Sequence, residues 1–208
     1  MTHARPFDFE QIKRDIRSPD QPTRGTSMAA LYHHAQQTPA IHPEALELFR
    51  ASVMAWPDYM TASYAARGIE LIAGPAEGRK IWLALLNHPK AELAGAIAQS
   101  IKDVSYVPVL LELMERRPEC SIQLAAVRTL GRMKHPSAFD AIINRLNNRP
   151  LRPHVVEALA ELGDPRAIPH LEPLLHDRTE AWEEDNHGPM LRVCDLAQAA
   201  IAHLRQNR

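Results

Sequence analysis

Apolar residues recur along most of the chain at the spacings expected of paired helices. Residues 124–146 and 153–175 align with an offset of 29 when His135-Pro136 is superposed on Asp164-Pro165. In each copy, apolar side chains occupy positions i, i+4 and i+7 before the superposed residue pair and positions i, i+3 and i+7 after it. Both spacings place the side chains on one face of a helix. The pattern therefore predicts a hairpin, in which a short break joins a first helix to a second.

The break between the two helices has its own sequence signature. Its clearest copy is Gly163-Asp164-Pro165, in which the glycine can end the first helix, the aspartate can cap the second and the proline suits the first helical position. Gly74-Pro75 and His135-Pro136 are weaker versions. These breaks predict where each second helix begins.

The same apolar columns extend upstream and downstream of the two best copies. The buried positions predicted for the first helices are Ala65, Ile69, Ile72, Ala94, Ala98, Ile101, Ala126, Leu130, Met133, Val155, Leu159, Leu162, Ala197, Ile201 and Leu204. Those predicted for the second helices are Gly78, Ile81, Leu85, Val107, Leu110, Met114, Phe139, Ile142, Leu146, Ile168, Leu171 and Leu175. A hairpin this short cannot bury its apolar stripe alone, so stacked neighbours must share one core. The pattern predicts an all-α fold, a right-handed α-solenoid of antiparallel helix hairpins.

Composition agrees with a helical chain. Alanine fills 30 of 208 positions and glycine only 8. Alanine loses no side-chain entropy in a helix, whereas sheet-rich folds need branched and aromatic residues. We expect about four hairpins and a closing helix over residues 60–206, and a degenerate first repeat or N-terminal cap over 28–59 with helices near 28–37 and 43–55. Residues 1–27 form a polar N-terminal segment with one short helix near 7–16 and a turn-rich loop at 18–26.

One of these repeats resembles a known family. The run ALAELGDPRAIPHLEPLL, residues 158–175, is similar to the short HEAT-like repeat of the phycobilisome-lyase type. The resemblance implies the solenoid fold. For function it implies less, because the family includes lyase and chaperone subunits as well as scaffolds.

Charge narrows the classes of partner. The chain has 24 Lys and Arg against 25 Asp and Glu, a formal net charge of −1. Nucleic-acid modules usually carry a basic excess that neutralises phosphates, so a nucleic-acid partner is disfavoured. The chain has neither an apolar run long enough to span a membrane nor the apolar run of a signal peptide near its start, and we expect a cytoplasmic protein.

Candidate catalytic and metal-binding residues lack the patterns that their chemistry needs. None of the 11 histidines precedes a glutamate, which departs from the His-Glu pairs of deoxyhypusine hydroxylases, a HEAT-like di-iron family. His170 and His176 are six residues apart and fall on different faces of one helix. Cys120 and Cys194 lack a recognisable base, and no phosphate-binding or dinucleotide-binding glycine motif is present. We expect no metal, no cofactor and no catalytic residue.

Two features remain as candidates for binding a partner. The first is the second-helix surface opposite the buried stripe, which we expect to be concave and which mixes both charge signs: Arg79, Lys80, Glu112, Asp140, Asn144, Arg166 and His170. The second is an insertion at 177–189, which lengthens the last step between first helices, from Leu162 to Leu204, to 42 residues. It surrounds Trp182 with acids that include Glu183, Glu184 and Asp185. Trp182 is either an exposed anchor for a basic partner or a lid folded over the last hairpin.

The sequence therefore favours a non-catalytic protein–protein interaction module, such as a scaffold, adaptor or chaperone, whose partner is another protein with a basic patch. The family resemblance keeps open an accessory lyase subunit that handles a bilin-like chromophore. A nucleic-acid binder of the DNA-glycosylase type is the least favoured alternative on charge. Oligomeric state stays open.

Overall fold

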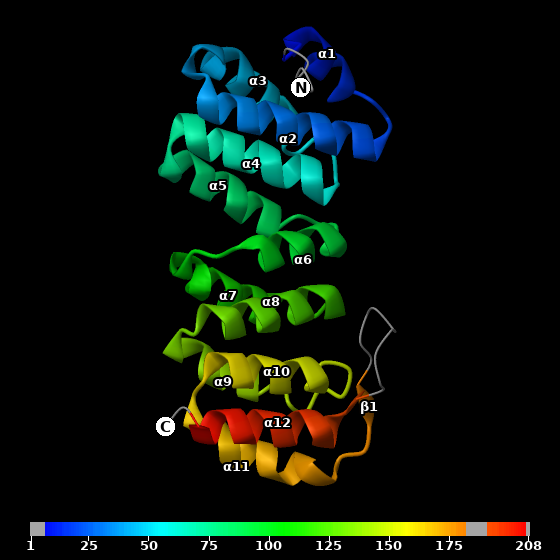
Figure 1. Ribbon diagram of the computed structural model, residues 1–208, viewed down its shortest axis with the longest axis vertical. Helices are drawn as coiled ribbons and strands as arrows, with labels where there is room; N and C mark the ends of the chain where they lie inside the picture. Colours follow the sequence, from blue (N-terminus) through cyan, green and yellow to red (C-terminus); the bar gives the residue numbers. More distant parts are fainter. Residues whose placement is uncertain (1–6, 182–190, 207–208) are drawn as a thin grey trace, which may run out of the picture. The chain divides into compact units, whose positions relative to one another are not determined.

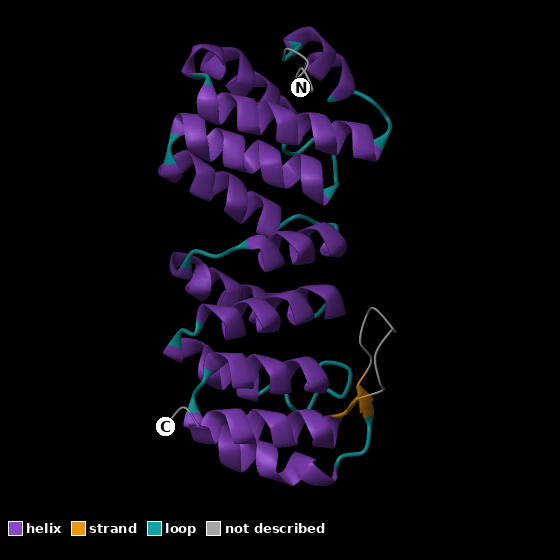
Figure 2. Cartoon of the chain, in the orientation of Figure 1, coloured by secondary structure: helices purple, strands orange, loops and turns teal. Residues whose placement is uncertain are grey.

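The chain folds into two compact units, residues 1–97 and 98–208. The structure is a computed structural model and describes residues 7–181 and 191–206. Both units are built mainly of helices joined by short breaks, and unit 2 also contains one pair of short strands (Figures 1 and 2). In the described part of the chain, no helix is both long enough and apolar enough to cross a bilayer.

Unit 1 is built around one central helix. Its helices are α1 (Phe9–Asp15), α2 (Gln21–Gln37), α3 (His42–Ser52), α4 (Tyr59–Ala73) and α5 (Pro75–Leu86), with a 3₁₀ turn at Pro39–Ile41 and with most of α6 (Ala91–Ser100). Helices α2, α3 and α5 all pack against α4. Phe49 of α3 is fully buried against Gly68 of α4, so the two helices meet without an intervening side chain at position 68.

In unit 2, three helices that the sequence pattern predicted as first helices of hairpins pack side by side. These are α8 (Cys120–Met133), α10 (Arg152–Leu162) and α12 (Val193–Gln206), and α10 lies between the other two (Figure 1). The second helices are α7 (Val107–Arg116), α9 (Phe139–Ile143) and α11 (Ile168–Leu171). The elements that complete the unit are 3₁₀ turns at Val104–Tyr106, Pro136–Ala138, Pro165–Ala167 and Glu172–His176, and strands β1 (Glu180–Ala181) and β2 (Leu191–Arg192).

The predicted apolar columns form the core. Of the first-helix positions, only Ile72 and Met133 are half-buried and the rest are buried. Of the second-helix positions, Ile81 and Leu146 are half-buried, and Leu175 is 40% exposed. Leu175 lies in the 3₁₀ turn that replaces the last turn of a regular helix, so its side chain leaves the buried stripe.

The predicted break is confirmed at residues 163–165. Gly163 has φ 77°, in the left-handed region that favours glycine, and ends α10. Asp164 accepts a hydrogen bond from the backbone N–H of Arg166 at 2.9 Å. Pro165 then begins a 3₁₀ turn that leads into α11. The second helices α9 and α11 are thus shorter than the sequence pattern suggested, because each starts as a 3₁₀ turn.

The predicted loop at 18–26 is wrong. Helix α2 begins at Gln21, because Asp20 caps it by accepting from the backbone N–H of Thr23 at 3.0 Å. Pro22 is tolerated in the first turn, where its missing N–H costs no helical hydrogen bond. The short helix predicted near 7–16 is present as α1.

A two-stranded antiparallel pair was not predicted. Glu180 pairs with Arg192 and Ala181 with Leu191, at the two ends of the segment that lies outside the described residues. This pair closes the base of the predicted insertion.

Candidate functional site

Every predicted partner-binding residue that the structure describes is accessible to solvent to some degree. Lys80, Glu112, Asp140, Asn144, Arg166 and His170 are exposed and Arg79 is half-buried. Arg79 and Lys80 lie on α5 in unit 1, and the others lie in unit 2. The insertion residues Trp182, Glu183, Glu184 and Asp185 lie outside the described residues.

Arg166 is the centre of a cluster that two neighbouring hairpins build in unit 2. Its guanidinium carbon lies 4.3 Å from the ring centroid of Phe139, the first residue of α9. The ring of His170, on α11, meets the same Phe139 edge-on with centroids 6.3 Å apart. We call Phe139, Asp140, Asp164, Arg166 and His170 the Arg166 cluster.

Asp164 fixes the orientation of the Arg166 side chain. Nε of Arg166 donates to Oδ1 and Oδ2 of Asp164 at 3.1 and 3.0 Å, and Nη2 donates to Oδ2 at 2.6 Å. These hydrogen bonds lower the pKa of Asp164 and raise the pKa of Arg166, and the charge of Asp140 adds to the rise. The Arg166 side chain is still 61% exposed. An exposed pair of this kind adds little to stability, but it holds a guanidinium ready for a ligand.

Arg166 keeps donor capacity for a partner. Among the residues that the structure describes, none accepts a hydrogen bond from its Nη1. Since Phe139 and Asp164 already hold the side chain, binding through Nη1 would cost little further rotamer entropy.

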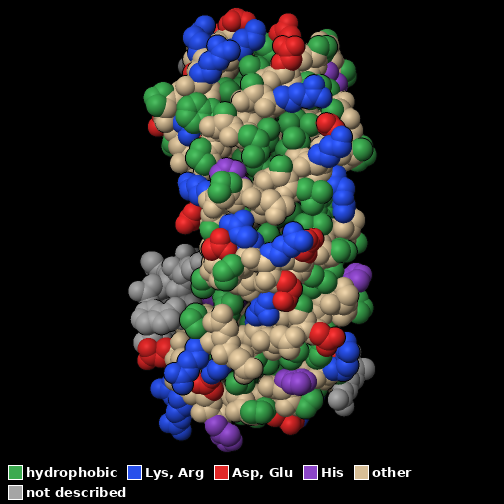
Figure 3. All heavy atoms as spheres, turned by 180° about the vertical axis from the view of Figure 1, so that it is seen from behind, with side chains coloured by type: hydrophobic (Ala, Val, Ile, Leu, Met, Phe, Trp, Pro, Cys, Tyr) green, Lys and Arg blue, Asp and Glu red, His purple; other side chains and the backbone are tan. Residues whose placement is uncertain are grey.

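The other predicted residues pair locally. Glu112 of α7 forms an ion pair with Arg116 at 2.8 Å, and Lys80 of α5 pairs with Glu77 at 3.0 Å. Asn144 ends α9, and its backbone N–H donates to the carbonyl of Asp140. Figure 3, which shows the face turned away from the viewer in Figure 1, has acidic and basic side chains interspersed with apolar ones. Such a mixture matches a protein partner better than a phosphate backbone.

The base of the insertion is anchored to α10. Asp177 accepts from Nη1 of Arg152 at 2.6 Å and from the backbone N–H of Thr179 at 3.0 Å. The backbone N–H of Cys194 donates to the carbonyl of Asp177 at 2.8 Å. Beside this anchor is an open cavity of about 240 Å³ lined by Arg149, Pro150, Pro153, His154, Thr179 and Glu180.

Sequence reasoning missed two contributors to these sites. Phe139 was predicted only as a core residue, although its ring also supports Arg166. Arg152 was not singled out at all. The spacing of Asp177 and Thr179, typical of an aspartate-initiated turn, was a signal for the anchor.

The described residues do not assemble a metal-binding site or a reactive-thiol site. No group of three or more His, Cys, Asp or Glu side chains there could hold a metal ion. Cys120 is exposed, Cys194 is half-buried, and both are free thiols.

Comparisons with known proteins concern the fold. The family model of HEAT repeats matches residues 107–184. No curated protein matches the chain. Among solved structures, the Escherichia coli protein YibA superposes with a TM-score of 0.56 at 14% identity, covering 96% of this chain and 71% of that one.

Two further solved structures superpose less closely. A designed armadillo repeat protein gives a TM-score of 0.46 at 18% identity, covering 95% of this chain and 100% of that one. The complex of CpcE and CpcF of the phycocyanin lyase of Nostoc sp. gives a TM-score of 0.40 at 20% identity, covering 98% and 67%. The phycobilisome-lyase type of the repeat stays a prediction. The HEAT-repeat model thus matches residues 107–184 of unit 2, and the packing of α8 against α10 agrees with that match.

Proposed function

We propose that the chain is a non-catalytic protein-interaction module, with the Arg166 cluster as the centre of its binding surface. The observation that carries the proposal is the exposed guanidinium of Arg166, held between the ring of Phe139 and the carboxylate of Asp164. Arginine and aromatic side chains dominate the energetics of protein interfaces, and a side chain that is already ordered loses less entropy on binding.

The partner surface extends from this cluster over the exposed residues of the second helices of unit 2. Glu112, Asp140 and Asn144 offer acceptors, while Arg166 and His170 offer donors. The acidic insertion adds carboxylates that suit a partner with a basic patch. A surface of both signs selects its partner by complementary placement of charges rather than by net charge.

The test compares capture by matched variants. The immobilised chain is exposed to native cytosol, and bound proteins are identified by mass spectrometry for wild type, Arg166→Ala and Lys102→Ala. Lys102 is exposed in unit 2 and lies outside the cluster, so it controls for the loss of one positive charge. We expect wild type and Lys102→Ala to capture equal amounts of the specific partner proteins. Arg166→Ala should capture at least tenfold less of the same proteins.

Two outcomes would contradict the proposal. The first is an identical set of captured proteins for Arg166→Ala and wild type, with both folded by circular dichroism. The second is a changed absorption spectrum when the chain is incubated with a bilin, which would support the chromophore-handling alternative.

A Trp182→Ala variant tests the insertion: weaker capture at unchanged melting temperature supports an exposed anchor, whereas a large drop in melting temperature makes Trp182 a core residue.

A further inference from the structure

Unit 1 carries a second surface that the proposed function does not use. It lies on α2 and α4 and consists of Tyr32, His33, Met60, Tyr64, Arg67 and Leu71, which we call the aromatic face. We propose that the aromatic face docks an amphipathic peptide segment of a partner protein, with a carboxylate of that segment bound by Arg67.

Helix α4 presents a continuous stripe with helical spacing. Met60, Tyr64, Arg67 and Leu71 follow one another at intervals of four, three and four residues, which places them on one side of the helix. Met60 is 40% exposed and Leu71 is 42% exposed, while Ala62, Ala65, Ala66 and Ile69 on the other sides are fully buried. At 1.5 Å per residue the stripe is roughly 16 Å long, the length of three helical turns in a partner.

The aromatic rings beside the stripe are fixed by one another. The ring of Tyr64 lies 5.8 Å from that of Tyr32 and 5.9 Å from that of His33, and Tyr32 and His33 are 5.3 Å apart. All three project from helices whose opposite sides are packed in the core. Rigid aromatic residues of this kind provide contact area at low entropic cost.

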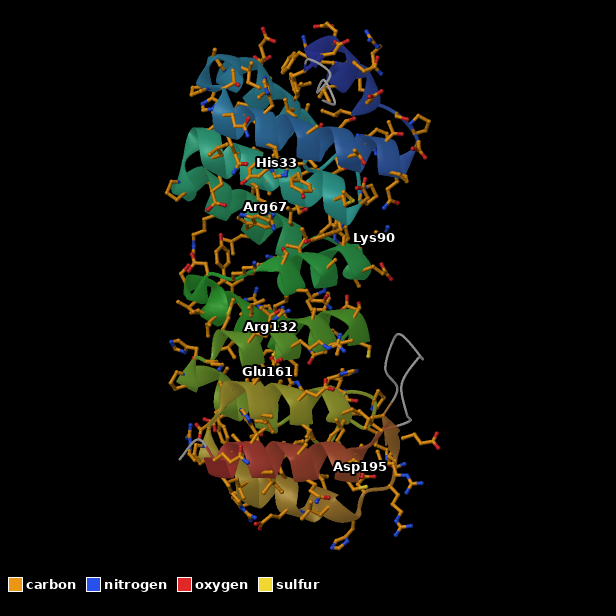
Figure 4. All side chains as sticks on the ribbon, viewed as in Figure 1. His33, Arg67, Lys90, Arg132, Glu161 and Asp195 are labelled. Carbon is orange, nitrogen blue, oxygen red and sulfur yellow. The ribbon has the colours of Figure 1, made fainter. Side chains whose placement is uncertain are left out.

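Arg67 is the only arginine of the aromatic face, and its guanidinium is available to bind a partner. Its Cζ lies 5.6 Å from the ring centroid of Tyr64. Neither its guanidinium nor the hydroxyl of Tyr64 makes a hydrogen bond or ion pair with any residue the structure describes. In Figure 4, the labelled His33 and Arg67 lie on the adjacent helices α2 and α4. This is unlike Arg166, whose guanidinium is already bound by Asp164.

The aromatic face supplies no carboxylate of its own to neutralise Arg67. Helix α2 contains no Asp or Glu between Gln21 and Gln37. The acidic residue of α4 is Glu70, which accepts from the indole N–H of Trp82 on α5 at 3.0 Å. Charge complementarity therefore calls for an acidic group from outside, and a carboxylate matches the two-pronged geometry of a guanidinium.

The apolar part of the face decides between classes of acidic ligand. Met60 and Leu71 lie on either side of Tyr64 and Arg67 along the stripe, and a nucleic-acid backbone would leave both side chains without apolar contacts. A peptide helix with Leu-like or aromatic residues on both sides of one Asp or Glu would cover them and reach Arg67. Methionine, tyrosine and arginine are also the residue types enriched at the centres of protein interfaces.

The experiment uses a displayed library of random 16-residue peptides, selected on the wild-type chain. We expect the enriched peptides to combine Asp or Glu with apolar residues at helical spacing, and to bind Arg67→Glu at least tenfold more weakly than wild type. Replacing the selected acid by Lys is expected to restore binding to Arg67→Glu. The matched control is Arg50→Glu, the same charge reversal at an exposed position of α3 in the same unit. It is expected to bind within twofold of wild type.

Three results would overturn the proposal, provided that circular dichroism shows Arg67→Glu to be folded. They are a library without enrichment, enriched peptides that bind Arg67→Glu and wild type equally, and self-association of the chain in sedimentation that Arg67→Glu abolishes. The last would assign the face to contacts between copies. Arg166→Ala is expected to leave peptide binding unchanged, which separates this test from that of the Arg166 cluster.

Discussion

Arg152, the first residue of α10, donates from Nη1 to Oδ2 of Asp177 over 2.6 Å. The two side chains are only 18% and 15% exposed, so the ion pair is partly shielded from water. Nε of Arg152 also donates to the carbonyl of Leu146. One side chain thus links the end of the α9 hairpin, the start of α10 and the base of the insertion.

Removing this link is expected to weaken unit 2. In Arg152→Ala, Asp177 loses its charged partner and the carbonyl of Leu146 loses a donor, so the free energy of unfolding should fall by about 1–2 kcal/mol. Urea unfolding measures the change, and proteolysis near the insertion should become faster. Arg178→Ala removes an exposed arginine next to Asp177 and is expected to stay within about 0.5 kcal/mol of wild type. Equal losses in the two variants would contradict the role assigned to Arg152.

The same carboxylate predicts a dependence of stability on pH. Hydrogen bonds from the hydroxyl and the backbone N–H of Thr179, together with Arg152, lower the pKa of Asp177. A lowered native pKa stabilises the fold fully above the ordinary aspartate pKa of about 3.9, and this contribution is lost as the pH falls through the native value. The stability difference between wild type and Asp177→Asn should therefore shrink as the pH falls from 6 towards 3. A difference that stays constant over that range would mean that the Asp177 charge contributes nothing.

The repeated hairpins could be predicted from the sequence because their signals are local. The face on which Leu130 or Leu159 lies follows from helical spacing alone, and both are fully buried. The wrong prediction of a loop at 18–26 also arose from reading local signals alone. Asp20, Pro22 and Gly25 are typical of turns, but an aspartate cap and a proline in the first turn also begin helices. Gly25 is needed where α2 meets α4, since a Cβ there would lie 2.9 Å from the Cβ of Met60.

The sites were harder to predict because they depend on which hairpins are neighbours. The exposure of Arg166 and His170 followed from their positions opposite the buried stripe. That both meet Phe139 of the preceding hairpin required the packing of α9 and α11. The aromatic face was missed because its residues come from two helices, α2 and α4, and helical spacing alone does not show that these helices pack against each other.

A buried ion pair inside unit 1 predicts a large effect. Nη2 of Arg24 lies 3.0 Å from Oδ2 of Asp58, and the two side chains are 7% and 6% exposed. The guanidinium also stacks on Trp56 at 4.1 Å, and Asp58 caps α4 by accepting from the N–H of Thr61. Arg24→Met should cost about 3–5 kcal/mol, because it leaves the Asp58 carboxylate buried without its partner.

A double-mutant cycle separates the ion pair from the packing of Arg24. Asp58→Asn keeps a side-chain oxygen for the cap but removes the charge, so Arg24→Met should cost less in that background. The free energies of unfolding of the four proteins in urea give the coupling. If the two losses simply add, the pair is not coupled, and the effect of Arg24→Met comes from its packing on Trp56 and its hydrogen bonds to the carbonyls of Ser18 and Pro19.

At Gly131, where α8 contacts α10, helix propensity favours alanine whereas packing favours glycine. Alanine favours a helix over glycine by about 1 kcal/mol, so Gly131→Ala would stabilise an unhindered helix. Here, however, the added Cβ would lie 2.8 Å from both the Cα and the carbonyl oxygen of Ala158. These are backbone atoms that can move only if the helices separate, and overpacking of this kind typically costs about 1–3 kcal/mol. We therefore expect Gly131→Ala to lower the melting temperature, and Ala158→Gly in the same chain to restore only part of the loss, because the backbone overlap remains. A raised melting temperature in Gly131→Ala would show that α8 and α10 lie farther apart than this contact requires.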